Sequence, residues 1–182
     1  GEAQSDTRDR ARLTSALFRL RGRSARTSLH AGCYAGGMDT LSPQDRSRVM
    51  ATVRGKNTRP EMLVRRLIHG AGYRYRLHRA GLPGRPDLVF PKKRKVIFVH
   101  GCFWHRHTDP DCPFARLPKT RLDFWLPKLE ANRLRDSANM VKLGEAGWHP
   151  LVVWECELRD MTKVAEKVQA FLGPTGRAER EC

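Results

Sequence analysis

Three segments of the chain repeat their apolar positions with the period of an amphipathic helix. The first covers residues 59–70, where Thr58 and Glu61 form a capping box ahead of a run of apolar positions. The second covers residues 123–146, and its predicted inward positions are Leu126, Leu129, Met140 and Leu143. The third begins after Asp160, a candidate cap, and its predicted inward positions are Val164, Val168 and Phe171.

Between these segments, short runs of aromatic and β-branched residues predict strands. Residues 73–77 alternate Tyr with Arg, as a half-exposed strand does, and residues 88–90 and 96–99 flank a basic turn, which predicts a hairpin. Residues 151–154 predict a further buried strand. The order of helix, three strands, helix, strand and helix predicts an α/β fold with a mixed β-sheet flanked by helices.

The composition is that of one compact domain with terminal segments. Of the 182 residues, 40% are apolar, which is enough for a single core. No stretch approaches the roughly 20 consecutive apolar residues of a membrane span, so a membrane protein is excluded. Residues 1–37 have no long apolar periodicity and are predicted to be a disordered extension. We expect the folded domain to cover residues 59–173 and a tail to cover residues 174–182.

The charge balance points to a polyanionic partner. Lys and Arg number 35 against 19 Asp and Glu, for a formal net charge of +16. Residues 1–37 contribute seven Arg and three acids, or +4, and the other 28 bases and 16 acids contribute +12. The predicted folded part is therefore itself basic, and nucleic acid is the commonest partner of such a surface.

Metal-ligating residues concentrate after the third predicted strand. Cys102, His107 and Cys112 are local, Cys156 follows the last predicted strand, and the four make a plausible tetrahedral Cys3His zinc set. A closed shell of four protein ligands leaves no position for a substrate water, so this zinc would be structural. The alternatives are inert core cysteines or disulfides, and an odd total of five cysteines with no mark of secretion disfavours disulfides.

A second candidate site begins at Asp87, in the run Gly84 to Asp87 ahead of a predicted strand. Its carboxylate and a carbonyl of the paired strand could hold a magnesium ion, whose bound water could attack a phosphodiester. His105 would then be the acid or base, because its usual pKa lies near neutral pH. The alternative for Asp87 is that it only shapes a turn. Glu61 has the same ambiguity, because its place in the capping box explains it without any role in catalysis.

Two pairs of adjacent aromatic residues lie in polar surroundings. Phe103 and Trp104 follow Cys102, and Phe124 and Trp125 follow a basic run. Such rings can insert between base pairs and kink a duplex. The alternative is core packing, which we expect for Phe124, Trp148 and Trp154.

Four motifs in this order resemble the very short patch repair (Vsr) DNA mismatch endonucleases. They are Gly84-Arg85-Pro86-Asp87, the run His100-Gly101-Cys102-Phe103-Trp104-His105, Lys119-Thr120-Arg121 with Phe124-Trp125, and Val153-Trp154-Glu155-Cys156. The resemblance covers about residues 43–172, and its six-residue run from His100 to His105 is highly specific.

The resemblance implies a restriction-endonuclease-like core with a structural zinc. It implies Mg-dependent nicking of double-stranded DNA on the 5′ side of the thymine in T:G mismatches, which arise when 5-methylcytosine deaminates. Such an enzyme works beside a DNA cytosine methyltransferase and passes its nick to a repair polymerase and ligase. It would be a monomer in the bacterial cytoplasm, associated with the nucleoid.

The resemblance also assigns roles to catalytic and metal-binding residues. Asp87 matches the magnesium-binding aspartate, and Val99 matches a position that binds the metal through its backbone carbonyl, where other members can have Thr. His105 matches the acid/base histidine, and His100 and Glu61 match supporting positions. The matched zinc ligands are Cys102, His107, Cys112 and Cys156, although the gap before Cys112 is longer than in some members.

The implied DNA contacts come from aromatic and basic residues. Phe103, Trp104 and Trp125 match an aromatic wedge at the mismatch. Met50 matches a residue of an N-terminal DNA-contacting arm, residues 38–58, that enters from the other groove. The basic DNA-binding candidates are Arg85, Lys119 and Arg121. A non-catalytic zinc-stabilised DNA-binding regulator and a structural RNA-binding protein are the alternative functions.

Overall fold

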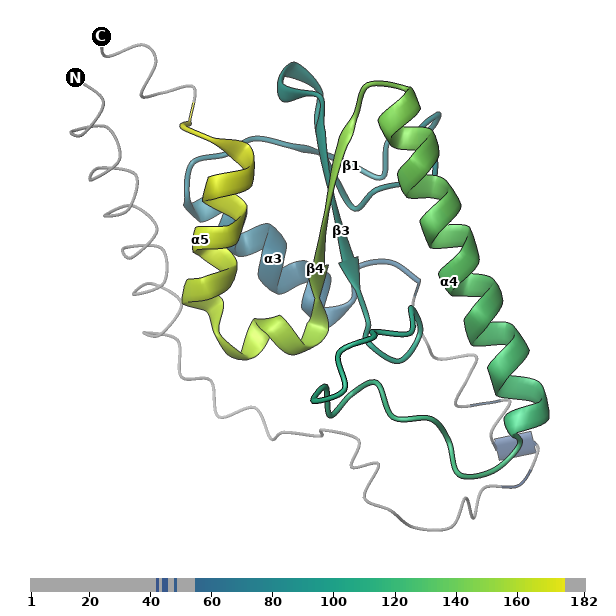
Figure 1. Cartoon of the computed structure of the whole chain (residues 1–182). Helices are drawn as coiled ribbons and strands as arrows, with labels where there is room; N and C mark the ends of the chain where they lie inside the picture. Colours follow the sequence, from purple (N-terminus) through teal and green to yellow (C-terminus); the bar gives the residue numbers. More distant parts are fainter. Residues whose placement is uncertain (1–41, 43, 46–47, 49–54, 176–182) are drawn as a thin grey trace, which may run out of the picture.

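The computed structural model describes residues 42, 44, 45, 48 and 55–175 (Figure 1). The predicted extension over residues 1–37, Met50, and residues 176–182 of the predicted tail lie outside the described residues, and so does most of the predicted arm.

The described elements follow the predicted order. The helices are α3 (Arg59–Gly70), α4 (Leu122–Glu145) and α5 (Met161–Leu172). The strands are β1 (Arg76–Leu77), β2 (Leu88–Phe90), β3 (Lys95–His100) and β4 (His149–Trp154), and two 3-10 turns, η1 (Pro91–Lys93) and η2 (Glu155–Arg159), follow β2 and β4. The predicted caps are confirmed, since Thr58 and Glu61 form the capping box of α3 and Asp160 accepts from two amides of α5.

The first strand is shorter than the predicted segment 73–77. In the antiparallel register of β1 with β2, Arg76 pairs with Val89 and Leu77 pairs with Leu88. If the same register continued to Arg74, that residue would lie opposite Pro91, which has no backbone N–H to donate. Tyr73 is instead buried, and its hydroxyl donates to the carbonyl of Gly173 over 2.7 Å.

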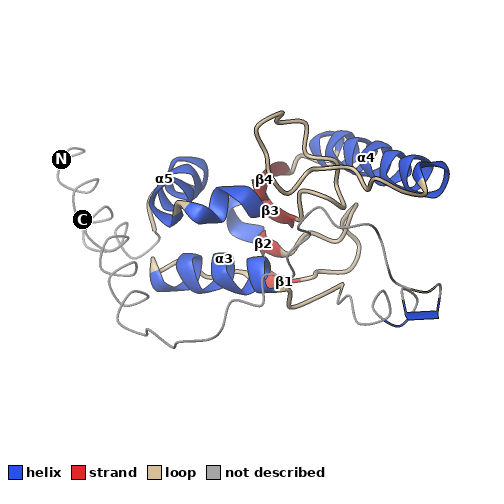
Figure 2. Ribbon diagram, turned by 90° about the horizontal axis from the view of Figure 1, so that it is seen from below, coloured by secondary structure: helices blue, strands red, loops and turns tan. Residues whose placement is uncertain are grey.

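The four strands form one sheet in the order β1-β2-β3-β4. The sheet is mixed and flanked by helices, as the sequence predicts. The pairs β1–β2 and β2–β3 are antiparallel, and β3 and β4 are parallel, with α4 in the connection between them. Helices α3 and α5 cover one face of the sheet and α4 covers the other, so the molecule has three layers (Figure 2).

Strand alternation divides the core between the two faces. Ile97 packs in the larger cluster with residues of α3 and α5, and its neighbours Val96 and Phe98 pack with Leu143 and Trp148 on the α4 side. This alternation is what a sheet buried on both faces requires, because successive side chains point to opposite faces.

The prediction for α4 is partly wrong. Leu129 and Leu143 are fully buried as expected, but Leu126 is 40% exposed, and Phe124, expected in the core, is 48% exposed. The N-terminal end of α4 extends beyond the end of β3, so its first residues have no sheet to cover (Figure 1). Amphipathic spacing identifies the inward face of a helix, but not where the sheet beneath it ends.

Between β3 and α4, residues 101–121 form a long loop without regular helix or strand. It runs along the carboxyl end of β3 and carries most of the predicted chemistry. In the part of the chain that the structure describes, no helix has the length and apolar character needed to cross a lipid bilayer.

Candidate active site and metal centre

Asp87 is held at the start of β2 by a tight turn and by the neighbouring strand. Gly84 has φ +72°, a backbone conformation that favours glycine, and a Cβ there would lie 3.0 Å from the Asn139 side chain of α4, which leaves little room for a larger residue. Asp87 Oδ2 accepts a hydrogen bond from the Val99 amide over 2.8 Å. The structure therefore brings Asp87 beside the strand position whose carbonyl was the expected second metal ligand.

The surroundings of Asp87 are charged and partly desolvated. Burial raises the pKa of Asp87, the Val99 amide opposes that shift, and the Glu61 carboxylate adds to it. Ligand atoms of Glu61, His78 and Asp87 all lie within 4.8 Å of one another. This cluster offers oxygen donors suited to a hard divalent cation.

Glu61 does more than cap α3. Its side chain is 3% exposed, pairs with the buried Arg65 and lies 3.2 Å from His78 Nε2. The interpretation of Glu61 as a cap alone is therefore incomplete, because the same carboxylate is a neighbour of Asp87. Arg65 and His78 were not predicted as site residues, because neither belongs to a motif.

The two predicted active-site histidines lie against each other. His100 ends β3, His105 lies in the following turn, and their rings stack with centroids 3.9 Å apart and planes 8° apart. Burial and the neighbouring His105 lower the pKa of His100 to about 4. The His100 ring is therefore neutral at physiological pH.

The partner of His105 is a residue that the sequence reasoning missed. His105 Nδ1 lies 2.6 Å from Asp136 Oδ2 on α4. A signal was present: Asp136 is seven residues from both Leu129 and Leu143, so it lies on the same face of α4 as these two buried leucines. A carboxylate on the inward face of an amphipathic helix needs a polar partner, and here the partner is the candidate acid/base.

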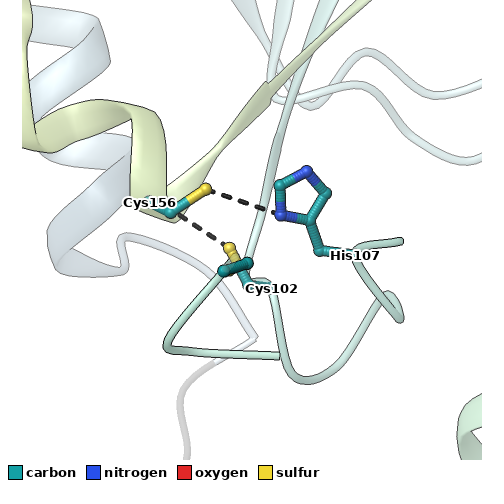
Figure 3. A group of neighbouring side chains, drawn as sticks. Cys102, His107 and Cys156 are labelled. Atoms are coloured by element: carbon teal, nitrogen blue, oxygen red, sulfur yellow. Dashed lines mark hydrogen bonds between the residues drawn. The ribbon is translucent and has the colours of Figure 1, made fainter. Parts of the chain in front are cut away.

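The four predicted zinc ligands meet at the carboxyl ends of β3 and β4. Ligand atoms of Cys102, His107, Cys112 and Cys156 all lie within 4.8 Å of one another. Figure 3 shows Cys102 and His107 from the loop and Cys156 from the chain after β4 pointing toward one another. All three described cysteines are free, so the disulfide alternative is wrong for them.

The geometry and donor chemistry of this Cys3His cluster fit a zinc ion. Ligands about 2.3 Å (sulfur) and about 2.0 Å (nitrogen) from a tetrahedral zinc lie about 3.5 Å apart, and Cys156 Sγ lies 3.5 Å from His107 Nδ1. The Cys156 amide also donates to Cys102 Sγ over 3.4 Å. Burial raises the pKa of the Cys102 and Cys156 thiols, so a cation is needed to hold them as thiolates.

Trp154 connects the Cys3His cluster to the histidine pair. Its ring stacks on His107 with centroids 4.2 Å apart and meets the edge of His100 at 5.3 Å. The prediction of Trp154 as a core residue is incomplete, because it is only half-buried and packs against imidazoles. Trp148 is buried as expected.

Three aromatic rings form a cluster next to these sites. Phe103, Trp104 and Trp125 are half-buried, and their centroids lie 5.0 to 6.1 Å apart in edge-to-face contacts. Asn132 of α4 donates to the Trp104 carbonyl over 3.1 Å, which fixes the turn that carries two of the rings. We call these residues the three-ring cluster.

The predicted basic contacts lie on the surface. The side chains of Arg85, Lys119 and Arg121 are exposed, the last two on the loop that leads into α4. A half-buried carboxylate, a histidine with a carboxylate partner, and exposed bases beside aromatic rings together indicate that this protein is a DNA endonuclease.

Comparison with known proteins agrees with this class. Residues 38–112 match the family model described as DNA mismatch endonuclease Vsr. A type II nicking enzyme of Xanthomonas oryzae pv. oryzae is 53% identical over 137 residues, covering 75% of this chain and 98% of the relative. A type II nicking enzyme of Neisseria meningitidis is 39% identical, covering 74% and 94%, and the DNA mismatch endonuclease Vsr of Escherichia coli is 42% identical, covering 71% and 81%.

The chain belongs to the Vsr family of DNA mismatch endonucleases. The resemblance stated from its motifs is thereby confirmed, and so is the expectation of a hydrolase that cuts DNA in repair. Membership of a family of endonucleases also disfavours the non-catalytic regulator and the RNA-binding alternatives.

Proposed function

We propose that this protein is a magnesium-dependent nickase that cuts one strand of double-stranded DNA 5′ of the thymine in T:G mismatches. The observation that carries the proposal is the placement of Asp87, the His105–Asp136 pair and the three-ring cluster around one end of the sheet. A mismatch recognised by the rings would thus lie next to the residues that cut the strand.

Asp87 and the Val99 backbone carbonyl would hold the magnesium ion, with Glu61 as a neighbouring carboxylate. When bound, magnesium supplies charge stabilisation to the phosphate oxygens and lowers the pKa of bound water. Asp136 accepts from Nδ1–H of His105, which leaves Nε2 of His105 to take or give the proton of the reaction. His100 stacks on His105 and holds its ring in place.

The Cys3His cluster would hold a structural zinc. Its four ligands join the loop after β3 to the chain after β4, so the ion would fix the turn that carries His105 and two rings of the three-ring cluster. The mixed sheet between α3 with α5 and α4 supports a restriction-endonuclease-like core.

Recognition of the mismatch would rest on how easily the DNA duplex is deformed at that base pair. Phe103, Trp104 and Trp125 would insert beside the mismatch, because unstacking costs a few kcal/mol and least at a mispaired base. Met50 and the arm over residues 38–58 would contact the other groove. The exposed bases Arg85, Lys119 and Arg121 would bind phosphates.

The cellular context follows from the substrate. T:G mismatches arise by deamination of 5-methylcytosine, so the protein would act beside a DNA cytosine methyltransferase. Its nick would need a repair polymerase and ligase. We expect a monomer that works at the bacterial nucleoid.

A nicking assay tests the proposal. Wild-type protein with magnesium should nick only the thymine strand of a T:G duplex and leave the matched duplexes intact, and Asp87→Ala should abolish nicking while T:G binding persists. Nicking without a divalent cation, or nicking by Asp87→Ala, would refute the metal role of Asp87. Equal cutting of matched DNA would refute the mismatch specificity.

A further inference from the structure

Phe124 is the most exposed aromatic side chain of the described residues, although its position in α4 predicted a core residue. Phe124 is 48% exposed. It lies in the first turn of α4, at the end of the helix that extends beyond the end of β3 (Figure 1). The ring meets Trp125 of the three-ring cluster edge to face, with centroids 5.2 Å apart. A large ring that gains so little burial contributes little to folding, so its place beside the cluster calls for another explanation.

Two cations lie over this ring. Arg121 Cζ is 5.5 Å from the Phe124 ring centroid and Lys128 Nζ is 5.4 Å from it, within the range of cation–π interactions. Lys128 Nζ also lies 5.6 Å from the Trp125 centroid. We call Arg121, Phe124 and Lys128 the cation–ring cluster.

Neither cation of the cation–ring cluster has an acidic partner among the described residues. Other bases of the domain do: Arg133 pairs with Glu130 and Lys167 with Glu157. Between residues 113 and 129 the chain has four bases and a single acid, Asp123. The ring therefore orders two positive charges that are free to bind an anion.

We propose that the cation–ring cluster is a phosphate clamp on the DNA next to the three-ring cluster, in which Phe124 positions Arg121 and Lys128 on successive or facing phosphates. The proposal rests on the proposed function, because it takes DNA as the partner. It assigns Phe124 and Lys128 to affinity, and leaves mismatch discrimination to the three-ring cluster.

The experiment measures binding to matched and T:G duplexes over a range of salt concentrations. Lys128→Ala should lower the slope of log affinity against log salt by about 0.9, the value for one lost phosphate contact. Lys142→Ala removes the same charge from an exposed position near the other end of α4 and should leave the slope closer to that of wild type.

Phe124 is tested with two variants. Phe124→Ala and Phe124→Leu should weaken binding to both duplexes by similar factors, and the losses from Phe124→Ala and Lys128→Ala should be less than additive, because the ring acts through the cations. Leu134→Ala, at a 57% exposed position of the same helix, is the control and should bind like wild type.

Three results would overturn the clamp. The first is a Lys128→Ala slope that is no lower than the Lys142→Ala slope. The second is wild-type binding by Phe124→Leu, which would mean that side-chain bulk suffices without a ring. The third is a loss of binding by the Phe124 variants that is confined to the T:G duplex, which would place Phe124 in the wedge. Because matched DNA reports the clamp, a wild-type protein that fails to nick T:G duplexes would refute the proposed function and leave the clamp standing.

Discussion

At the scale of single residues, the contact between His105 and Asp136 determines how the candidate acid/base works. An ionised carboxylate only accepts hydrogen bonds, so Asp136 places the proton of the neutral imidazole on Nδ1. The other nitrogen of His105 is then the one available to the substrate. We therefore expect Asp136 to act as a positioning residue, through His105.

Replacing Asp136 should slow nicking without weakening DNA binding. Asp136→Asn keeps the size of the side chain but removes the charge that orients His105, and acid/base catalysis by a positioned group contributes about 10²–10⁴-fold. We expect a loss within that range in single-turnover nicking, with unchanged affinity for a T:G duplex. Glu145→Gln, an exposed acid of the same helix, controls for charge; equal rates for Asp136→Asn and this control would exclude the positioning role.

Short motifs predicted contacts between residues that are close in sequence or that lie on paired strands. Asp87 and Val99 are brought together by the β2–β3 hairpin, and the position of Cys112, the ligand with the unusual spacing, agrees with the predicted zinc set. Asp136 was not predicted as a site residue, because its contact with His105 depends on how α4 is placed over the loop after β3. That placement is set by tertiary packing, which no local pattern contains.

At the scale of elements, α4 is held to the sheet by few residues. Leu129 and Leu143 are its fully buried side chains, fourteen residues apart, and the N-terminal turns project past the sheet. Periodicity predicted the helix and its inward face, but it could not predict the point where packing begins. Leu126 and Phe124 were misplaced for this reason.

Substitutions along α4 should separate these two regions. Leu143→Ala should lower the free energy of unfolding by about 2–5 kcal/mol, because it leaves a cavity against Trp148 and β3. Leu126→Ala should change it by no more than about 0.5 kcal/mol, as expected for a surface position. Urea denaturation measures both values, and similar losses for the two variants would contradict the projecting end of α4.

The loop over residues 101–121 should depend on its metal. It has no regular secondary structure, and the Cys3His cluster joins it to the chain after β4, next to the stacking of His107 on Trp154. We expect about one zinc per wild-type chain by elemental analysis. Cys112→Ser should lower zinc content and melting temperature together, and a chelator should destabilise the wild type more than this variant.

A cysteine outside the predicted zinc set provides the control for that experiment. Cys182→Ser should retain the zinc and the melting temperature of the wild type. Wild-type protein purified without zinc, yet melting at the same temperature with and without a chelator, would show that the Cys3His cluster needs no metal.

At the scale of the whole molecule, we expect charge and aromatic rings to make different contributions to DNA binding. A formal charge of +12 over residues 38–182 supplies attraction to any duplex, which is sensitive to salt and blind to sequence. The three-ring cluster is small by comparison and contributes nothing to the charge. Because insertion of a ring is least costly where stacking is already weak, discrimination should depend on the rings and affinity on the bases.

Trp104→Ala and Lys119→Ala should therefore change DNA binding in different ways. Lys119→Ala removes a phosphate contact and should weaken binding to matched and T:G duplexes by similar factors, with a salt slope lower by about 0.9. Trp104→Ala removes a ring that contacts both Phe103 and Trp125, so it should reduce the ratio of T:G to matched affinity more than the matched affinity itself. Equilibrium binding to both duplexes measures the ratio, and thermal melting checks that each variant is folded. An equal loss on both duplexes by Trp104→Ala would mean that the rings serve general affinity, and recognition of the mismatch would then have to come from other contacts.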